Sequence, residues 1–119
     1  MENKNLVIGI VGPCKSGKTT LQLGLISRGY QGKQIAQEHS FSPSMWKVLT
    51  KPDVLIFLNV SYENMVERGK ANWLEKDYVE QYRRLSHAEE HADLAVDTDK
   101  NGIEEVLKLV IEFVNSLPV

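Results

Sequence analysis

Eight residues near the amino end constrain this chain more than any other feature. The run Gly12 to Thr19 reads Gly-Pro-Cys-Lys-Ser-Gly-Lys-Thr and fits the phosphate-loop (Walker A) pattern G-x-x-x-x-G-K-[ST]. The apolar run Leu6 to Val11 precedes it, and the helix-forming stretch Thr20 to Arg28 follows it. Because a phosphate loop joins a buried strand to a helix, this context separates the motif from a chance glycine-rich turn. The motif predicts an anion-binding turn in an α/β fold.

The residue types in this turn have specific expected tasks. Gly12 and Gly17 let the backbone turn tightly and point successive N–H groups inward, which makes an anion cradle. Lys18 can reach the β- and γ-phosphates of a nucleoside triphosphate, and the Thr19 hydroxyl can ligate Mg²⁺. We therefore predict a site for a nucleoside triphosphate with Mg²⁺, made by Gly12, Pro13, Cys14, Lys15, Ser16, Gly17, Lys18, Thr19 and Thr20.

The composition is that of an ordinary globular domain. The 119 residues are 42% hydrophobic and 25% charged, which predicts one nucleotide-binding domain over residues 1–119 with a core that needs no disulfide. A formal net charge of -2 argues against broad nucleic-acid binding, because such binding usually needs a basic face. Cys14 is the single cysteine, and no signal peptide or long apolar span is apparent, so we expect a cytoplasmic protein with no membrane contact.

Apolar runs alternate with amphipathic stretches along the chain, which is typical of an α/β domain with a mostly parallel sheet. Val54 to Val60 is almost wholly apolar, as expected of a central parallel strand. Gly29 suits the left-handed cap that ends the first helix. We predict a three-layer α/β/α sandwich with strands at 6–11, 34–37, 54–60 and 94–96 and helices at 18–28, 45–49, 61–68, 77–92 and 103–114.

Several helix starts and faces can be predicted in more detail. Ser61 is expected to cap the third helix, Asp77 with Glu80 the fourth, and Asn101 with Glu104 the last. The apolar face of the last helix, 103–114, is interpreted as part of the core. The alternative is that a homodimer buries this face. The two expected apolar stripes consist of Val79, Tyr82 and Leu85 in the fourth helix, and of Ile103, Val106, Leu107, Val110, Ile111 and Val114 in the last.

Three stretches resemble the P-loop kinases of nucleosides, nucleotides and other small metabolites, particularly thymidylate and deoxynucleoside kinases. Gly12 to Thr19 matches their phosphate loop, and Lys51 to Ser61 is similar to their Pro-Asp strand with the capped helix after it. Glu67 to Leu85 is similar to their arginine-bearing lid and the next helix. The resemblance implies a P-loop NTPase fold and an ATP-dependent kinase. Only residues 39–51 stand where the family usually carries a substrate-binding insertion, so the acceptor pocket looks truncated or rebuilt.

Phosphoryl transfer needs a carboxylate near the metal or the attacking hydroxyl. Glu38 is the candidate, because it is expected to follow a short strand, and ligands of open α/β sheets collect at the carboxyl ends of strands. The run Gln37 to Ser40 also resembles the Glu-Arg-Ser motif of deoxynucleoside kinases. We assign Glu38 to Mg²⁺ together with Thr19, with a solvated strand end as the alternative. His39 is a candidate contact to substrate or phosphate, and Asp53 is a weaker one because it should lie at the opposite sheet edge.

Arg68 is the expected cation that stabilises the transferring phosphoryl group. By resemblance, a hinged lid from Gly69 to Lys76 would bring it over the phosphates. Arg83 and Arg84 are alternatives, although a solvated charged helix face explains them better. Trp73 could anchor the lid, stack on a purine or simply pack.

Three further features have a chemical and a plain interpretation. His87 to His91 matches the zinc-peptidase pattern H-x-x-E-H, but no third ligand is apparent, so two surface histidines are the expected explanation. Cys14 lies near helical N–H groups, which lower the pKa of a thiol and favour its alkylation. The plain interpretation is that Cys14, like most variable positions of a phosphate loop, contributes only its backbone N–H. The resemblance implies that the nucleobase packs near the residues after the last strand, which are Asp97, Asp99 and Lys100. The chain lacks the guanine-specifying Asn-Lys-x-Asp arrangement, so we expect ATP.

Two function classes follow from these features. The first is a small kinase that transfers the γ-phosphate of ATP to a small-molecule acceptor, with Lys18, Glu38 and Arg68 as its catalytic residues. The second is a nucleotide-binding regulatory or partner-binding module with little or no turnover. Turnover that depends on an acceptor separates the two.

Overall fold

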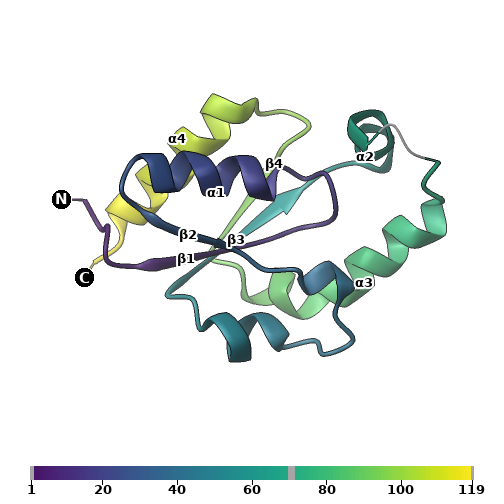
Figure 1. The fold of residues 1–119 in the computed structure, drawn as a ribbon, viewed down its shortest axis with the longest axis horizontal. Helices are drawn as coiled ribbons and strands as arrows, with labels where there is room; N and C mark the ends of the chain where they lie inside the picture. Colours follow the sequence, from purple (N-terminus) through teal and green to yellow (C-terminus); the bar gives the residue numbers. More distant parts are fainter. Residues whose placement is uncertain (1, 70–71, 119) are drawn as a thin grey trace.

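A parallel β-sheet forms the centre of the molecule (Figure 1). The structure is a computed structural model and describes residues 2–69 and 72–118. Neighbouring strands pair in parallel throughout, with Val11 opposite Phe57 and Asn59 opposite Asp97. The carboxyl ends of the described strands therefore meet at one edge. In the order β2-β1-β3-β4, the strands are β1 (Val7–Val11), β2 (Gln31–Gln34), β3 (Val54–Asn59) and β4 (Leu94–Asp97).

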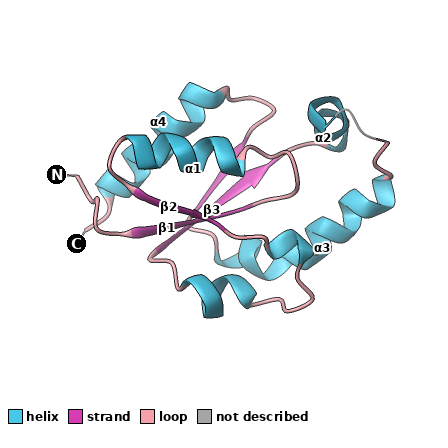
Figure 2. Ribbon diagram, in the orientation of Figure 1, coloured by secondary structure: helices cyan, strands magenta, loops and turns pink. Residues whose placement is uncertain are grey.

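Helices cover both faces of the sheet, which makes the predicted three-layer α/β/α sandwich (Figure 2). On one face lie α1 and α4, and on the other lie α3 and a π-helical turn, while α2 follows the carboxyl end of β3. The bounds are α1 (Lys18–Ser27), a 3₁₀ turn (Gln37–His39), the π-helical turn (Trp46–Thr50), α2 (Tyr62–Gly69), α3 (Glu75–His91) and α4 (Ile103–Ser116).

Two hydrophobic cores hold these layers together. Because parallel strands are covered on both faces, alternate residues of β3 serve opposite cores. Burial of such side chains, at roughly 1.5–3 kcal/mol each, is what offsets the entropy of ordering the chain. The core under α1 and α4 includes Ile8, Ile10, Leu25, Ile56, Leu58 and Val110, and the core under α3 consists of Val11, Ile35, Trp46, Leu55, Phe57, Leu85 and Ala88.

The second strand is the main error in the predicted elements. It lies at Gln31–Gln34, whereas the sequence predicted 34–37. This edge strand pairs with β1 through its backbone alone, and all of its side chains are polar or absent. Gly32 packs so closely on α1 that an added Cβ would lie 3.2 Å from Leu25. A polar edge strand of this kind has no apolar pattern from which its bounds could be predicted.

The helix ends are partly as predicted. Helix α1 begins at Lys18, and Gly29 after its end has a φ of 86°, so the predicted left-handed glycine is confirmed. Ser61 accepts a hydrogen bond from the Asn64 N–H at 3.2 Å, so the predicted cap of α2 is confirmed as well. The Asp77–Glu80 cap is wrong, because α3 already begins at Glu75 after Leu74. The Asn101–Glu104 cap is also wrong, because Gly102 occupies the N-cap of α4 and no side chain caps it.

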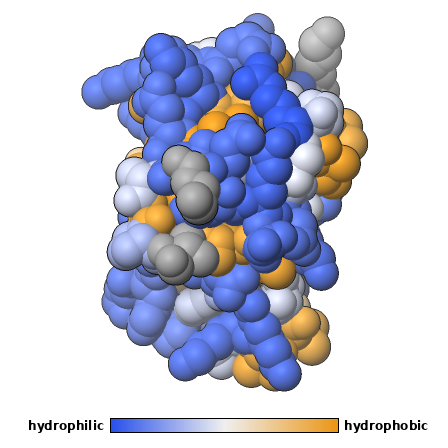
Figure 3. All heavy atoms as spheres, turned by 90° about the vertical axis from the view of Figure 1, so that its left-hand side faces the viewer, coloured by the Kyte–Doolittle hydropathy of each residue, from blue (hydrophilic) through white to orange (hydrophobic). Residues whose placement is uncertain are grey.

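Two residues assigned to apolar stripes lie outside the core. Val79 is 59% exposed and Ile103 is 66% exposed, whereas Leu85 and the middle of α4 are buried as predicted. Hydrophilic residues cover most of the side of the molecule that carries the two termini, and hydrophobic residues appear there in separate patches (Figure 3). None of the described helices combines the length and apolarity that a membrane span requires.

Gly9, in the middle of β1, provides a test of how this strand packs against the segments that follow β2 and precede β3. An added Cβ at Gly9 would lie 2.8 Å from the Pro52 Cβ, 3.1 Å from the Pro52 Cγ and 3.0 Å from the Ile35 Cδ1, and the proline ring cannot turn away as a flexible side chain can. Gly9→Ala should therefore lower the free energy of unfolding by about 1–3 kcal/mol. The measurement is urea unfolding followed by circular dichroism.

The matched control is Gly24→Ala in α1. Its Cβ would meet only the flexible end of Leu107, at 3.1 Å, and alanine is favoured over glycine in a helix by about 1 kcal/mol. This variant should be as stable as the wild type or more stable. Equal stability of Gly9→Ala and wild type would contradict the described packing of β1.

Candidate functional site

The turn between β1 and α1 has the backbone of an anion cradle. At Gly12 an added Cβ would lie 2.5 Å from the Leu58 carbonyl oxygen, so only glycine fits there. Lys15 and Gly17 have φ of 65° and 100°, and Gly17 leads directly into α1. Left-handed residues in such a turn gather successive N–H groups into a concave row, and the amino end of the helix adds partial positive charge. The expected tight turn is thus present.

The Lys18 side chain lies across this turn and is only 9% exposed. Its Nζ donates to the carbonyl oxygens of Gly12 and Pro13 at 2.7 and 3.0 Å and to the Glu38 carboxylate at 2.7 Å. An ammonium group has three donors, so all of them are engaged. The cation is therefore held at the turn before any ligand arrives.

Glu38 lies in the 3₁₀ turn Gln37–His39, at the same sheet edge as the phosphate loop. Glu38 is 4% exposed, so the alternative interpretation of a solvated strand end is wrong. One carboxylate oxygen, Oε2, pairs with Lys18, while the buried Oε1 has no hydrogen-bond partner among residues 2–69 and 72–118. A buried oxygen without a partner is rare, and it leaves a lone pair for a metal ion or a donor.

A buried glutamine fixes the position of the Glu38 turn. Gln37 is fully buried, and its Oε1 accepts from the Trp46 N–H at 2.9 Å while its Nε2 donates to the Ser42 carbonyl at 2.8 Å. These bonds tie the turn to the π-helical segment that packs in the second core. Sequence reasoning missed Gln37, because an isolated glutamine outside a helix or strand pattern has no signal of its own.

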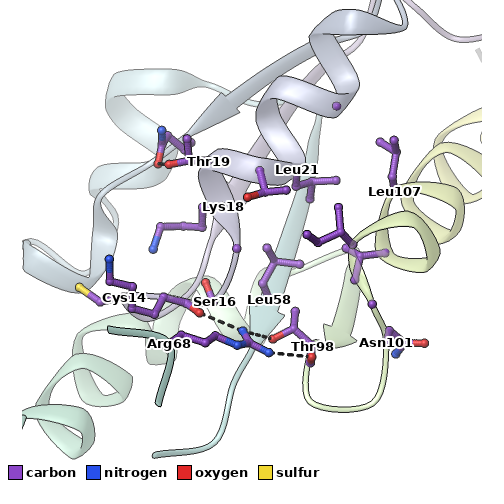
Figure 4. A pocket seen from close by; sticks show the side chains of 18 of the residues that line it. Cys14, Ser16, Lys18, Thr19, Leu21, Leu58, Arg68, Thr98, Asn101 and Leu107 are labelled. Atoms are coloured by element: carbon purple, nitrogen blue, oxygen red, sulfur yellow. Dashed lines mark hydrogen bonds between the residues drawn. The ribbon is translucent and has the colours of Figure 1, made fainter. Parts of the chain in front are cut away.

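Arg68 reaches the phosphate loop from the end of α2 (Figure 4). Its guanidinium donates to the Lys15 carbonyl at 2.9 Å, to the Thr98 Oγ1 at 3.1 Å and to the Thr98 carbonyl at 2.9 Å. Arg68 therefore contacts the loop without any closure of a lid. Of the predicted lid, residues 70 and 71 lie outside the described residues, Gly69 ends α2 and Lys76 lies in α3.

A cavity of about 1010 Å³ opens beside the phosphate loop and extends over α1 toward the start of α4 (Figure 4). Its wall combines loop residues with apolar residues of the first core, which suits a ligand with a charged and an apolar part. Thr19 lines it, and the Thr19 hydroxyl donates to the Gln34 Oε1 at 3.2 Å. The lining includes Cys14, Lys15, Ser16, Gly17, Lys18, Thr20, Leu21, Arg68, Trp73, Thr98, Asn101, Gly102 and Ile103.

The residues after β4 that line the cavity differ from those that the sequence predicted. Thr98, Asn101 and Gly102 line the cavity, whereas Asp97, Asp99 and Lys100 do not. The Asp99 carboxylate is instead directed to α2, where it accepts hydrogen bonds from Ser61 and Asn64. Burial opposes ionisation of Asp99, but these hydrogen bonds outweigh it and lower the pKa of the carboxyl.

Two residues of the predicted nucleotide site, Gly12 and Pro13, do not line the cavity. Their carbonyl oxygens accept hydrogen bonds from Lys18 instead.

The Cys14 thiol lies between the loop and the Glu38 turn. Its Sγ is 3.3 Å from the His39 Nε2 and 4.0 Å from the Glu38 Oε2, and its backbone N–H donates to the Gln81 Oε1 at 2.9 Å. The alternative of a lowered thiol pKa is wrong, because burial and the nearby Glu38 charge raise the pKa of Cys14.

The remaining candidates lie away from the cavity. Arg83 and Arg84 pair with Glu80 on α3, as a charged helix face would. The rings of His87 and His91 stack at 4.3 Å, and the Trp46 indole N–H donates to the His87 Nδ1 at 3.1 Å. The Asp53 carboxylate accepts from the Val7 N–H at 2.7 Å at the opposite sheet edge, as predicted.

A phosphate-loop turn after the first strand of a parallel sheet with helices on both faces is an α/β arrangement compatible with a P-loop NTPase-like fold. Over 85 residues the chain is 29% identical to a protein of Methanocaldococcus jannaschii named "Probable thymidylate kinase". The match covers 68% of this chain and 45% of that protein, so the chain spans less than half the length of the curated relative. No family model matches the chain. The similarity supports a distant relation to P-loop kinases and, at most, a nucleotide-kinase-like role.

The buried Lys18–Glu38 pair gives a testable energetic prediction. Removing one partner leaves the other charge buried without compensation, so Lys18→Met should cost about 3 kcal/mol of unfolding free energy. The double variant Lys18→Met/Glu38→Leu removes both charges and should be more stable than Lys18→Met alone. Urea unfolding of wild type, both single variants and the double variant gives the coupling energy. Additive losses would mean that the two charges do not interact in the folded protein.

Proposed function

We propose that this protein binds ATP with Mg²⁺ at the Gly12–Thr19 loop and transfers the γ-phosphate to a small, nucleotide-like acceptor. The observation that carries the proposal is the meeting of two cations, Lys18 and Arg68, on the concave loop at the mouth of the cavity. The similarity to a protein named as a thymidylate kinase supports the same reaction class. The domain is proposed to act as a single unit over residues 1–119.

Nucleotide binding requires an exchange at Lys18. Its three donors are already engaged, one of them by the Glu38 carboxylate at 2.7 Å. A phosphate oxygen carries the same charge and accepts the same hydrogen bond, so it can replace Glu38 on Lys18 without leaving the ammonium group unpaired. The two carbonyl contacts keep Lys18 at the loop during this exchange. Glu38 thus becomes available as the phosphate arrives.

The residues present fit a magnesium ion. Mg²⁺ prefers oxygen ligands. The buried Glu38 Oε1 has no partner in the described part of the chain, and Thr19 lines the cavity. Glu38 and Thr19 would hold the ion. When bound, Mg²⁺ supplies charge neutralisation to the phosphate oxygens. Glu38 is the group of this chain that would orient the ion or the attacking hydroxyl.

Arg68 and the cavity have separate tasks in this proposal. The Arg68 guanidinium is held at the loop by three hydrogen bonds and can stabilise charge that develops on the transferring phosphoryl group. Fixed dipoles and charges of this kind cost no reorganisation at the moment of reaction. The nucleoside part would lie in the cavity between Trp73 and the loop Thr98 to Ile103, where apolar and polar groups alternate.

A nucleotide-binding regulatory module is the second candidate function. In the segment 39–51, where the resemblance indicates a truncated or rebuilt acceptor pocket, Trp46 is buried in the second core and Met45 packs against it. Such a module would bind nucleotide at the same loop with little turnover. The two candidates differ only in whether an acceptor stimulates hydrolysis or transfer.

Nucleotide binding is tested by calorimetry with ATP and Mg²⁺. Lys18→Met should weaken binding at least about tenfold, because a charge-assisted hydrogen bond to phosphate is worth about 1.5–3 kcal/mol. Lys33→Met is the matched control, since Lys33 is exposed on β2 and lies outside the cavity lining. Far-ultraviolet circular dichroism checks that both variants are folded. Unchanged affinity in folded Lys18→Met would refute the phosphate site.

Catalysis is tested by ADP release with nucleoside monophosphates, nucleosides and sugars as acceptors. Glu38→Gln should lower kcat at least about tenfold with little change in nucleotide affinity, and Arg68→Ala at least about a hundredfold. Arg83→Ala is the control and should keep wild-type turnover, because Arg83 pairs with Glu80 on the outer side of α3. ATP binding without acceptor-stimulated turnover would favour the regulatory module.

A further inference from the structure

Three side chains of metal-ligating type meet at the edge of the phosphate loop. Cys14 comes from the loop, and Glu38 with His39 comes from the 3₁₀ turn. The separations are 3.3 Å between Sγ and the His39 Nε2, 4.0 Å between Sγ and the Glu38 Oε2, and 3.8 Å between Nε2 and Oε2. Among the described residues, this is the group of three or more whose donor atoms lie close enough to share one ion.

The separations match those that a tetrahedral zinc ion requires. Zinc binds thiolate at about 2.3 Å, imidazole at about 2.1 Å and carboxylate at about 2.0 Å. At the tetrahedral angle these lengths place S and N about 3.6 Å apart, S and O about 3.5 Å apart, and N and O about 3.4 Å apart. The observed separations differ from these values by no more than about 0.5 Å, a change within the reach of side-chain rotation.

We propose that Cys14, Glu38 and His39 form a zinc-binding site with an open fourth position. Thiolate and imidazole select Zn²⁺ over the oxygen-preferring Mg²⁺. The Glu38 side chain is 5% exposed. Its Oε2, the oxygen that lies near the thiol and the imidazole, also accepts from Lys18 at 2.7 Å, whereas its Oε1 has no partner among the described residues, so the carboxylate keeps unused ligand capacity. The His39 side chain is 59% exposed, which gives an ion a path from solvent. Binding releases the thiol proton to water as the sulfur–zinc bond forms.

The surrounding contacts hold the ligands in place before the ion binds. The Gln81 side chain accepts from the Cys14 N–H at 2.9 Å, and Gln37 ties the Glu38 turn to the π-helical segment. Such outer contacts are what orient ligands in metal sites. Three protein ligands with an open position are typical of zinc sites that bind water or a substrate oxygen. The site borders the phosphate loop, so Zn²⁺ and a Mg²⁺–nucleotide complex would compete for Glu38.

Alkylation of the single cysteine tests the site without any nucleotide. Because Cys14 is the only thiol, iodoacetamide incorporation measured by mass spectrometry reports this residue alone. One equivalent of Zn²⁺ added to chelator-treated protein should slow alkylation at least about tenfold. His39→Gln should remove the protection, and His91→Gln should keep it, since His91 lies on α3 outside the cluster. Unprotected wild-type Cys14, or equal protection in His39→Gln, would overturn the site.

Cobalt spectroscopy adds a readout that depends on the ligand atoms themselves. Co²⁺ bound to the wild-type protein should give a thiolate charge-transfer band in the near ultraviolet and the intense visible bands of tetrahedral cobalt. Cys14→Ser should lose the charge-transfer band while circular dichroism shows a folded protein. A band that persists in Cys14→Ser would refute the proposal. Because neither measurement involves ATP, failure of the proposed kinase function would leave this result unchanged, and the reverse also holds.

Discussion

The buried ion pair between Lys18 and Glu38 is the interaction on which the site depends. Taking two charges out of water is costly, and here the cost is offset by a 2.7 Å contact and by two loop carbonyls that accept from Lys18. The pair ties the phosphate loop to the turn after β2. This contact matters because β2 is a polar edge strand without apolar side chains that could anchor the turn. Because no described residue bonds to the Glu38 Oε1, the burial of the pair is compensated only in part. Such an arrangement favours exchange with an incoming anion or cation.

The architecture of the parallel sheet explains why these groups meet. All described strands end at the same edge, so the loops after β1, β2 and β4 lie near one another although they are far apart in the chain. Arg68 then bridges two of them, since its guanidinium binds both the Lys15 carbonyl and Thr98. Polar side chains that would be solvated in an isolated loop become buried and directed here. Hydrogen bonds hold both cations at the loop, and Lys18 and Arg68 both line the cavity.

Glu38 belongs to both proposed sets of metal ligands. With Thr19 it offers oxygen ligands suited to Mg²⁺, and with Cys14 and His39 it offers a mixed set suited to Zn²⁺. The two sets share the Glu38 carboxylate, and both take a further ligand from the phosphate loop. A protein with this arrangement could couple its nucleotide state to a second metal ion. Such coupling would be reciprocal, because competition for one ligand weakens both partners equally.

The sequence by itself determined the class of fold and the place of the phosphate loop. The apolar run of β3, the glycines at 12 and 17 and the period of α4 each follow from local rules of backbone freedom and burial, which act within a few residues. Tertiary structure decided the second strand, because Gln31–Gln34 has no apolar pattern and forms through pairing with β1. It also decided that Glu38 is buried, that Gln37 fixes its turn, and that Cys14 has a raised thiol pKa. Those properties depend on neighbours distant in the chain, whose charge and burial no local pattern can specify.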